Sequence, residues 1–219
     1  MNKVFVVAPH MDDEVLGVGG TILKHLDAGD RVKVCFLCHR KYGNRFDSAK
    51  NEVEVRHSLA AKAILDYQEV VHLNLEDERL DDAVHKIIEP LQKEAAEFDP
   101  DITYIPFIDN NQDHRAAFEA CIVVFRPFAS NYKSLMTYEV LSSTDQSPPI
   151  QPFLFSPNYY VDISPFLERK IEAMELYETE RREWPHPRSP EAVNVMAKKR
   201  GMEVNLNAAE AFMILRQRW

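Results

Sequence analysis

The sequence predicts an α/β fold: a Rossmann-like three-layer sandwich with a mostly parallel sheet and a C-terminal elaboration. In the first half of the chain, four short β-branched and apolar runs alternate with segments whose apolar residues recur at helical spacing. This alternation is typical of βαβ units, in which helices cover a parallel sheet. The 219 residues, 45% of them hydrophobic, suffice for a sizeable core, and we predict a single domain over residues 1–219.

The first two predicted strands flank the most regular helical pattern. Residues 4–8 form a continuous apolar run that Pro9 ends, as expected of a strand buried on both faces. From residue 14 onward, apolar residues repeat at helical spacing until Gly29 and Asp30, and residues 32–37 form the second strand. The polar and basic stretch 39–50 predicts a mobile loop.

Two further helices and two further strands complete the first half. Residues 59–64 supply a helix face, and residues 70–75 form the third strand. The helical pattern over 80–98 contains Pro90, which predicts a kink or a break followed by a restart. Residues 102–106 form the fourth strand.

The second half supplies the C-terminal elaboration. A helix is predicted over 114–125, and predicted strands over 135–141 and 159–163 flank a loop rich in serine, proline and glutamine. Ser164 and Pro165 begin another helix, whereas the three prolines of residues 184–190 exclude one there. Ser189 and Pro190 begin the last clear helix, which Gly201 ends.

Composition argues against several classes of function. The formal net charge is −9, whereas binding of nucleic acid or of an acidic membrane surface calls for a basic face. No apolar run reaches the length of a membrane span, and the N-terminus does not read as a signal peptide. Cys35 and Cys38 have the C-x-x-C spacing but lie in a predicted buried strand, which favours structural thiols over a redox pair. We expect a cytoplasmic protein with reduced cysteines.

Imidazole and carboxylate side chains follow two of the predicted strands. His10, Asp12 and Asp13 come directly after the first strand, and Asp113 and His114 come shortly after the fourth. Ligands of parallel sheets bind at the carboxyl ends of the strands, where both clusters fall. His10, Asp13 and His114 could supply three protein ligands to Zn²⁺, Fe²⁺ or another divalent ion, with a fourth position open for catalysis. The alternative, carboxylates that only stabilise a helix dipole, does not explain the histidines.

Three glycines after the first strand raise the possibility of a dinucleotide site. Gly17, Gly19 and Gly20 fall inside the helical pattern rather than in the turn before it, and their spacing does not match G-x-G-x-x-G. We therefore reject this interpretation. The glycines instead predict close packing of the helix against the sheet.

Two motifs resemble the signatures of a known family. The segment Ala8-Pro9-His10-Met11-Asp12-Asp13-Glu14 is similar to the A-H-P-D-D-E signature of the LmbE/PIG-L family of metal-dependent de-N-acetylases, and Asn111-Gln112-Asp113-His114 is similar to its H-x-D-H signature. The resemblance continues at residues 160–164, 170–177, 186–189, 200–201 and 209–212, and so covers nearly the whole chain.

The resemblance implies hydrolysis of the N-acetyl group of an amino sugar or sugar conjugate. His10, Asp13 and His114 are similar to the family's metal ligands, and Asp12 is similar to its general base. The metal would lower the pKa of a bound water molecule and polarise the amide carbonyl, while Asp12 takes the water proton. Asp113 resembles the carboxylate that orients a ligand, for which His114 is the neighbouring candidate.

The chain departs from the family pattern at two positions. Met11 replaces a proline of no chemical role. Asn111 replaces the first histidine of H-x-D-H, which in the family steadies the tetrahedral intermediate or protonates the leaving amine. An asparagine amide can donate a hydrogen bond but cannot deliver a proton. Either Asp12 acts as both base and acid, or His186 supplies the proton, or the protein is a weakened metal- or sugar-binding homologue.

Substrate contacts are less well marked. Arg56, His186 and Arg188 are candidates for binding the small-molecule N-acetylated sugar, and Trp184 is a candidate for stacking on a sugar face. An exposed surface position is the competing interpretation for Arg56. A metal amidohydrolase that acts on a non-sugar amide stays open as an alternative function. Self-association into a homo-oligomer is a separate possibility for the assembly of the protein.

Overall fold

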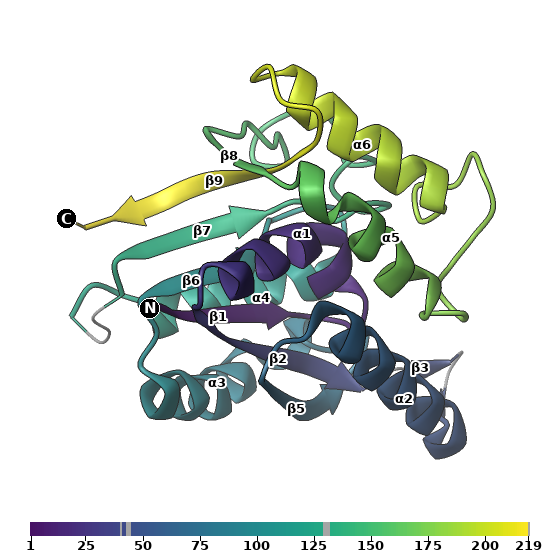
Figure 1. Ribbon diagram of the computed structural model, residues 1–219. Helices are drawn as coiled ribbons and strands as arrows, with labels where there is room; N and C mark the ends of the chain where they lie inside the picture. The colour runs from purple at the N-terminus through teal and green to yellow at the C-terminus, as the bar shows by residue number, and fades with distance from the viewer. Residues whose placement is uncertain (40, 43–44, 129–131, 219) are drawn as a thin grey trace.

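A seven-stranded sheet is the centre of the fold (Figure 1). The computed structural model describes residues 1–39, 41–42, 45–128 and 132–218. The strand order is β5-β2-β1-β6-β7-β9-β8, and β9 is antiparallel to both of its neighbours, whereas β5, β2, β1, β6 and β7 pair in parallel. The strands are β1 (Lys3–Ala8), β2 (Arg31–His39), β5 (Glu69–Glu76), β6 (Ile102–Pro106), β7 (Ser134–Tyr138), β8 (Tyr159–Asp162) and β9 (Ala209–Gln217).

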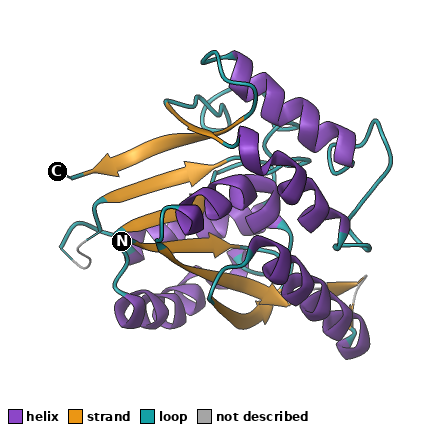
Figure 2. Ribbon diagram, viewed as in Figure 1, coloured by secondary structure: helices purple, strands orange, loops and turns teal. Residues whose placement is uncertain are grey.

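Helices cover both faces of this sheet (Figure 2). Because successive side chains of β1 point to opposite faces, Val4 and Val6 join one hydrophobic cluster and Phe5 and Val7 join the other. The first cluster lies under α1 (Asp13–Asp27), α2 (Ser48–Leu65), α5 (Leu167–Glu175) and α6 (Pro190–Met202), and the second under α3 (Val84–Phe98) and α4 (Gln112–Val124). The predicted three-layer α/β fold with a mostly parallel sheet is confirmed.

Two expectations about the first half need correction. The predicted loop 39–50 contains a short hairpin of β3 (Lys41–Tyr42) and β4 (Arg45–Phe46). The next helix begins already at Ser48, because the Asp47 side chain accepts hydrogen bonds from the backbone N–H groups of Ala49 and Lys50. In α3 the helix continues through Pro90, so the break and restart is excluded and the kink stays a prediction.

The second half contains a strand that the sequence analysis missed. Strand β9 lies between β7 and β8 and so joins the last segment of the chain to the sheet. One of its buried residues is Glu210, which accepts hydrogen bonds from the backbone N–H groups of Gly20 (2.9 Å) and Thr21 (2.7 Å). Lys170 of α5 donates to the same carboxylate at 2.6 Å and to the carbonyl oxygen of Leu16 at 2.9 Å. A buried ion pair therefore ties α1, α5 and β9 together.

The glycines of α1 lie where the helix approaches the sheet most closely. A Cβ atom on Gly17 would lie 2.1 Å from Cδ2 of Tyr138, and one on Gly20 would lie 2.7 Å from Ile163. The predicted close packing is confirmed at these two positions. Among the helices that the structure describes, none is both long and apolar enough to cross a membrane.

Substitution of Gly17 by alanine is expected to destabilise the fold. The new methyl group would collide with the ring of Tyr138, which is fixed by a 2.7 Å hydrogen bond from its hydroxyl to the carbonyl oxygen of Val7. We expect the free energy of unfolding, measured by urea denaturation, to fall by about 2–3 kcal/mol. The matched control is Gly19→Ala, whose methyl group meets the flexible Lys170 side chain at 3.3 Å and Cγ1 of Val15 at 3.6 Å, without a collision like that at Gly17. An equal loss in both variants would contradict the packing argument.

Candidate active site

A strained turn at the end of β1 places two adjacent carboxylates in the protein interior. Asp12 has φ of 124°, a conformation that residues other than glycine seldom adopt. Two side-chain hydrogen bonds stabilise the turn: the N–H of Asp12 donates to Glu14 at 3.1 Å, and the N–H of His10 donates to Asp13 at 2.9 Å. Asp12 and Asp13 are both fully buried as a result.

Three of the predicted ligands lie close together beside this turn. Nδ1 of His10 is 3.3 Å from Oδ2 of Asp13, and Nε2 of His114, from the first turn of α4, is 3.4 Å from the same oxygen. One ligand atom from each of the three residues lies within 4.8 Å of the others. The ends of β1 and β6 thus bring His10, Asp13 and His114 together as the sequence analysis expected of parallel strands.

Carboxylates orient both imidazole rings. Nδ1 of His114 lies 2.8 Å from Oδ2 of Asp109, and Nε2 of His10 lies 3.2 Å from Oδ2 of Asp113 and 3.1 Å from Oδ1 of Asp77. A ring N–H that donates to these carboxylates leaves the other ring nitrogen with a lone pair toward Asp13. This is the arrangement that histidine ligands of metal ions need.

The expected partner of His114 was wrong. Asp113 was expected to orient its neighbour, but it lies against His10 and also accepts hydrogen bonds from the backbone N–H groups of Glu78 (2.7 Å) and Leu80 (3.1 Å). Adjacent residues on a helix point in directions about 100° apart, so one of them seldom orients the other. Asp109, which follows β6, orients His114 instead. Its position directly after a predicted strand was the feature of the sequence that could have indicated this role.

The electrostatics of these residues suit a divalent cation. Burial alone would lower the pKa of His114, but the carboxylates of Asp13 and Asp109 raise it to about 9. Burial also opposes the charged form of His10, yet the hydrogen bonds from its ring to Asp113, Asp13 and Asp77 raise its pKa well above the ordinary value. Oδ1 of Asp13 is buried and has no hydrogen-bond partner among the residues that the structure describes. Two imidazoles and one carboxylate with an unused oxygen form a donor set that fits zinc.

Asp12 lies next to an arginine from the second half of the chain. Nη1 of Arg188 is 3.3 Å from Oδ2 of Asp12 and also forms an ion pair with Glu180. Arg188 directly precedes Ser189, whose side chain caps α6, so the helix start fixes its position. The structure thus brings this predicted residue to Asp12.

The buried side chain of Glu14 stabilises the turn after β1. Oε1 of Glu14 accepts a 2.6 Å hydrogen bond from the hydroxyl group of Tyr177, and Oε2 accepts the N–H of Asp12. Burial, with a contribution from the charge of Asp12, raises the pKa of Glu14 to about 8. The sequence alone does not reveal this support, because Tyr177 lies 163 positions from Glu14.

Asn111 combines a structural contact with a position in the cleft. Its Oδ1 accepts the N–H of Asp113 at 2.8 Å and so caps α4. The side-chain amide nitrogen stays available as a donor. Asn111 lies on the wall of a cleft of about 480 Å³, whose lining also includes His10, Asp77, Asp113, Thr179 and Arg182.

The remaining predicted residues lie farther from the ligand set. Arg56 is exposed on α2, and Trp184 is 58% exposed. His186 is half-buried, and its Nδ1 accepts the N–H of Arg188 at 3.1 Å. Burial and the charges of Arg188 and Arg182 hold the pKa of His186 below its ordinary value, so its ring is neutral near pH 7.

Comparisons with known proteins agree with this geometry. A family model described as PIG-L, GlcNAc-PI de-N-acetylase, matches residues 5–125, a range that includes His10, Asp12, Asp13 and His114. The range exceeds half of the chain and ends with α4.

Solved structures of similar fold include proteins with different activities. A conserved protein of Thermus thermophilus is 23% identical, with a TM-score of 0.81 over 100% of this chain and 97% of that chain. An N,N'-diacetylchitobiose deacetylase of Pyrococcus horikoshii is 20% identical, with a TM-score of 0.75; the match covers 98% of this chain and 84% of that chain. A 4-carboxy-2-hydroxymuconate hydratase of Pseudomonas putida is 18% identical, with a TM-score of 0.75; the match covers 100% of this chain and 98% of that chain. At these identities the likeness concerns the fold alone.

Metal binding by the metal-free protein is expected to release protons. The pKa of His114 is about 9 and that of His10 is also well above its ordinary value, so both rings carry an extra proton at pH 7 when no metal is bound. The affinity for one equivalent of zinc should therefore rise with pH near neutrality, because binding must displace the proton of His114, whose pKa is about 9, and that of His10. Calorimetry in buffers of different ionisation enthalpy measures the released protons. Binding without proton release would contradict the two pKa shifts.

Proposed function

Because the chain belongs to the PIG-L family of GlcNAc-PI de-N-acetylases, we propose that it is a metal-dependent hydrolase that removes the N-acetyl group from an amino sugar or sugar conjugate. The observation that carries the proposal is the buried carboxylate of Asp12 directly beside the converging side chains of His10, Asp13 and His114. A family match without this cluster would support the fold only.

His10, Asp13 and His114 would hold the metal, with zinc as the first candidate and Fe²⁺ or another divalent ion as alternatives. When bound, such an ion lowers the pKa of a water molecule and polarises the amide carbonyl. Asp109 and Asp113 hold the two imidazoles in the tautomers that this requires. The unused Oδ1 of Asp13 supports the placement of a cation at this point.

Asp12 would take the proton of the attacking water on its carboxylate. The guanidinium group of Arg188 at 3.3 Å favours the ionised form of Asp12, which a base needs. Hydrolysis also needs a donor for the oxyanion and a proton for the leaving amine. The amide nitrogen of Asn111 can serve the oxyanion, and Asp12 can return the proton that it accepted. His186 is the alternative proton donor, but its lowered pKa keeps the ring neutral near pH 7 and so disfavours this role.

The cleft supports a sugar as substrate. Its lining is rich in side chains that exchange hydrogen bonds with hydroxyl groups: two asparagines, one glutamine, one threonine and several carboxylates. Trp184, which is exposed in the same segment as Thr179 and Arg188, is proposed to stack on a sugar face. Arg56 is proposed as an outer contact from α2.

The direct test of the function is acetate release from a panel of N-acetylhexosamine conjugates by the metal-loaded protein. A deacetylase releases acetate from at least one member, and removal of the metal by a chelator abolishes the release. Acetate release only from non-sugar amides would indicate the wider class of amidohydrolases. Binding of the sugars without any acetate release would support the weakened homologue instead.

Asp12→Asn is expected to abolish turnover while the metal stays bound. The amide has nearly the shape of the carboxylate but cannot accept the water proton, and loss of a general base costs about a hundredfold to ten-thousandfold in rate. Measurement of kcat together with metal content by elemental analysis checks both parts. The control Asp27→Asn makes the same chemical change at the exposed far end of α1 and should leave kcat unchanged. Full turnover by Asp12→Asn would contradict the assignment of the base.

Asn111→His is expected to raise kcat. The imidazole can donate a proton that the amide cannot, so we expect a gain of about tenfold or more if the chain lacks a dedicated acid. The free energy of unfolding should fall by about 1 kcal/mol because the cap of α4 is lost. The control Asn207→His places the same group on an exposed residue that does not line the cleft, where no gain is expected. An unchanged or lower kcat at Asn111→His, with metal bound, would show that Asp12 or His186 already supplies the proton.

Location and assembly stay proposals. The three cysteines are all free and buried, which supports a reducing, cytoplasmic compartment. Self-association into a homo-oligomer is testable by sedimentation.

A further inference from the structure

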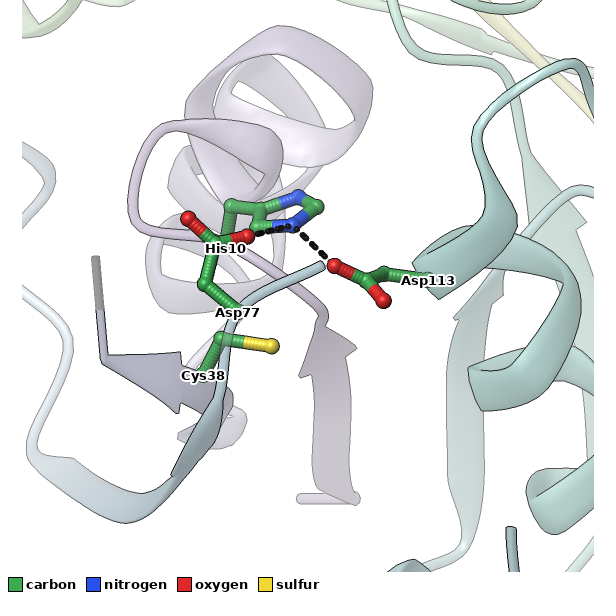
Figure 3. A group of neighbouring side chains, drawn as sticks. All are labelled: His10, Cys38, Asp77 and Asp113. Atoms are coloured by element: carbon green, nitrogen blue, oxygen red, sulfur yellow. Dashed lines mark hydrogen bonds and ion pairs between the residues drawn. The ribbon is translucent and has the colours of Figure 1, made fainter. Parts of the chain in front are cut away.

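The two imidazole rings of the candidate site are oriented by different surroundings. Nε2 of His10 faces carboxylate oxygens of Asp77 at 3.1 Å and of Asp113 at 3.2 Å (Figure 3). Nδ1 of His114 instead lies 2.8 Å from Oδ2 of Asp109. The direction of the His114 ring therefore depends on how the carboxylate of Asp109 is held.

A threonine from the second half of the chain contacts the same oxygen of Asp109. The hydroxyl oxygen of Thr144 lies 2.9 Å from Oδ2 of Asp109, and the backbone nitrogen of Val140 lies 2.9 Å from the same hydroxyl oxygen. Because a backbone N–H group can only donate, Thr144 accepts from Val140 and has its own hydrogen left for Asp109. This hydrogen points at the carboxylate whatever the protonation of His114.

Hydrogen bonds also fix the turn that contains Thr144. The backbone N–H of Thr144 donates to the carbonyl oxygen of Val140 at 2.9 Å, so these two residues exchange two hydrogen bonds. The hydroxyl group of Ser147 accepts the backbone N–H of Asn110 at 2.9 Å and donates to the carbonyl oxygen of Ser143 at 2.9 Å. The turn after β7 thus contacts the segment between β6 and α4 through two hydroxyl groups.

Asp109 is held at both of its carboxylate oxygens. Oδ1 accepts the backbone N–H of Asn111 at 2.9 Å, and Oδ2 faces the hydroxyl group of Thr144 and the ring of His114. The terminal torsion of an aspartate side chain has a broad energy minimum, so one hydrogen bond does not fix the plane of the carboxylate. Thr144 supplies the second fixed donor and so directs Oδ2 to the ring.

We propose that Thr144 is a positioning residue for the metal site. Its hydroxyl group fixes the carboxylate of Asp109, and Asp109 in turn directs Nε2 of His114 toward Asp13, from which it is 3.4 Å away. The inference rests on the proposed function, because that function makes His114 a metal ligand. Thr144 does not line the described cleft and acts through Asp109.

Zinc affinity of matched variants tests this role. Thr144→Val removes the hydroxyl group and nearly keeps the shape of the side chain, and we expect the affinity of the metal-stripped protein for Zn²⁺ to fall by about tenfold or more. Competition with a chromophoric chelator measures the affinity. Thr144→Ser keeps the hydroxyl group and should bind zinc as the wild type does. The control is Thr103→Val in β6, which removes a fully buried hydroxyl group that has no hydrogen-bond partner among the described residues and should leave the affinity unchanged.

A double-mutant cycle separates positioning from a general loss of structure. In an Asp109→Asn background, which lacks the carboxylate that Thr144 fixes, Thr144→Val should cost little further zinc affinity, whereas independent effects would add. Urea denaturation with a chelator present shows whether each variant is folded. If Thr144→Val does not fold, Thr144→Ala removes the same hydroxyl group without adding a methyl group and takes its place in the comparison.

The proposal is overturned if loss of the hydroxyl group leaves zinc affinity unchanged, if Thr144→Ser loses as much affinity as Thr144→Val, or if the losses at Thr144 and Asp109 add. Acetate release is measured separately on the wild type. A wild type that binds zinc but releases no acetate would contradict the deacetylase function and leave the role of Thr144 intact, so the two failures give different results.

Discussion

The negative charges of buried carboxylates must be balanced by hydrogen-bond donors and positive charges, and the rest of the structure depends on this constraint. The carboxyl edge of the sheet buries several acidic side chains within one small volume, and burial of a charge without a partner is costly. Two imidazoles, one guanidinium group and several backbone N–H groups face them. Asp109 and Asp113 illustrate the pattern, since each accepts from a histidine ring and from backbone N–H groups. The divalent cation proposed above would complete this compensation of negative charge.

The C-terminal half builds one wall of the site. The chain after β8 returns to the sheet as β9, and the buried pair of Lys170 and Glu210 links α5 and β9 to the middle of α1. The segment after α5 then brings Tyr177 to Glu14, and the start of α6 brings Arg188 to Asp12. The geometry of the turn after β1 thus depends on residues more than 150 positions later. Loss of the buried ion pair would disturb the base as well as the core.

The sequence predicted what depends on periodicity and strand order, and it failed where single contacts decide. Strand ends were enough to bring His10 and His114 together, because parallel strands end at one edge of the sheet. The carboxylate that orients His114 depends on one side-chain direction, which spacing does not reveal, so Asp109 was passed over. Strand β9 was missed because a short apolar run such as residues 211–215 does not by itself distinguish a strand from a buried helix. The burial of Glu210 depends on contacts with Lys170 and with two backbone N–H groups of α1, which the sequence does not reveal.

The two histidines of the site differ in how firmly they are held. Nδ1 of His114 faces Asp109 at 2.8 Å, and the same oxygen of Asp109 also accepts the hydroxyl group of Thr144 at 2.9 Å. Nε2 of His10 instead faces two carboxylates at more than 3 Å and a thiol. Nδ1 of His114 is therefore fixed by one carboxylate, which leaves Nε2, the nitrogen that faces Asp13, for the proposed metal. Asp77 and Asp113, which line the cleft together with His10, would control how strongly Nδ1 of His10 binds that metal.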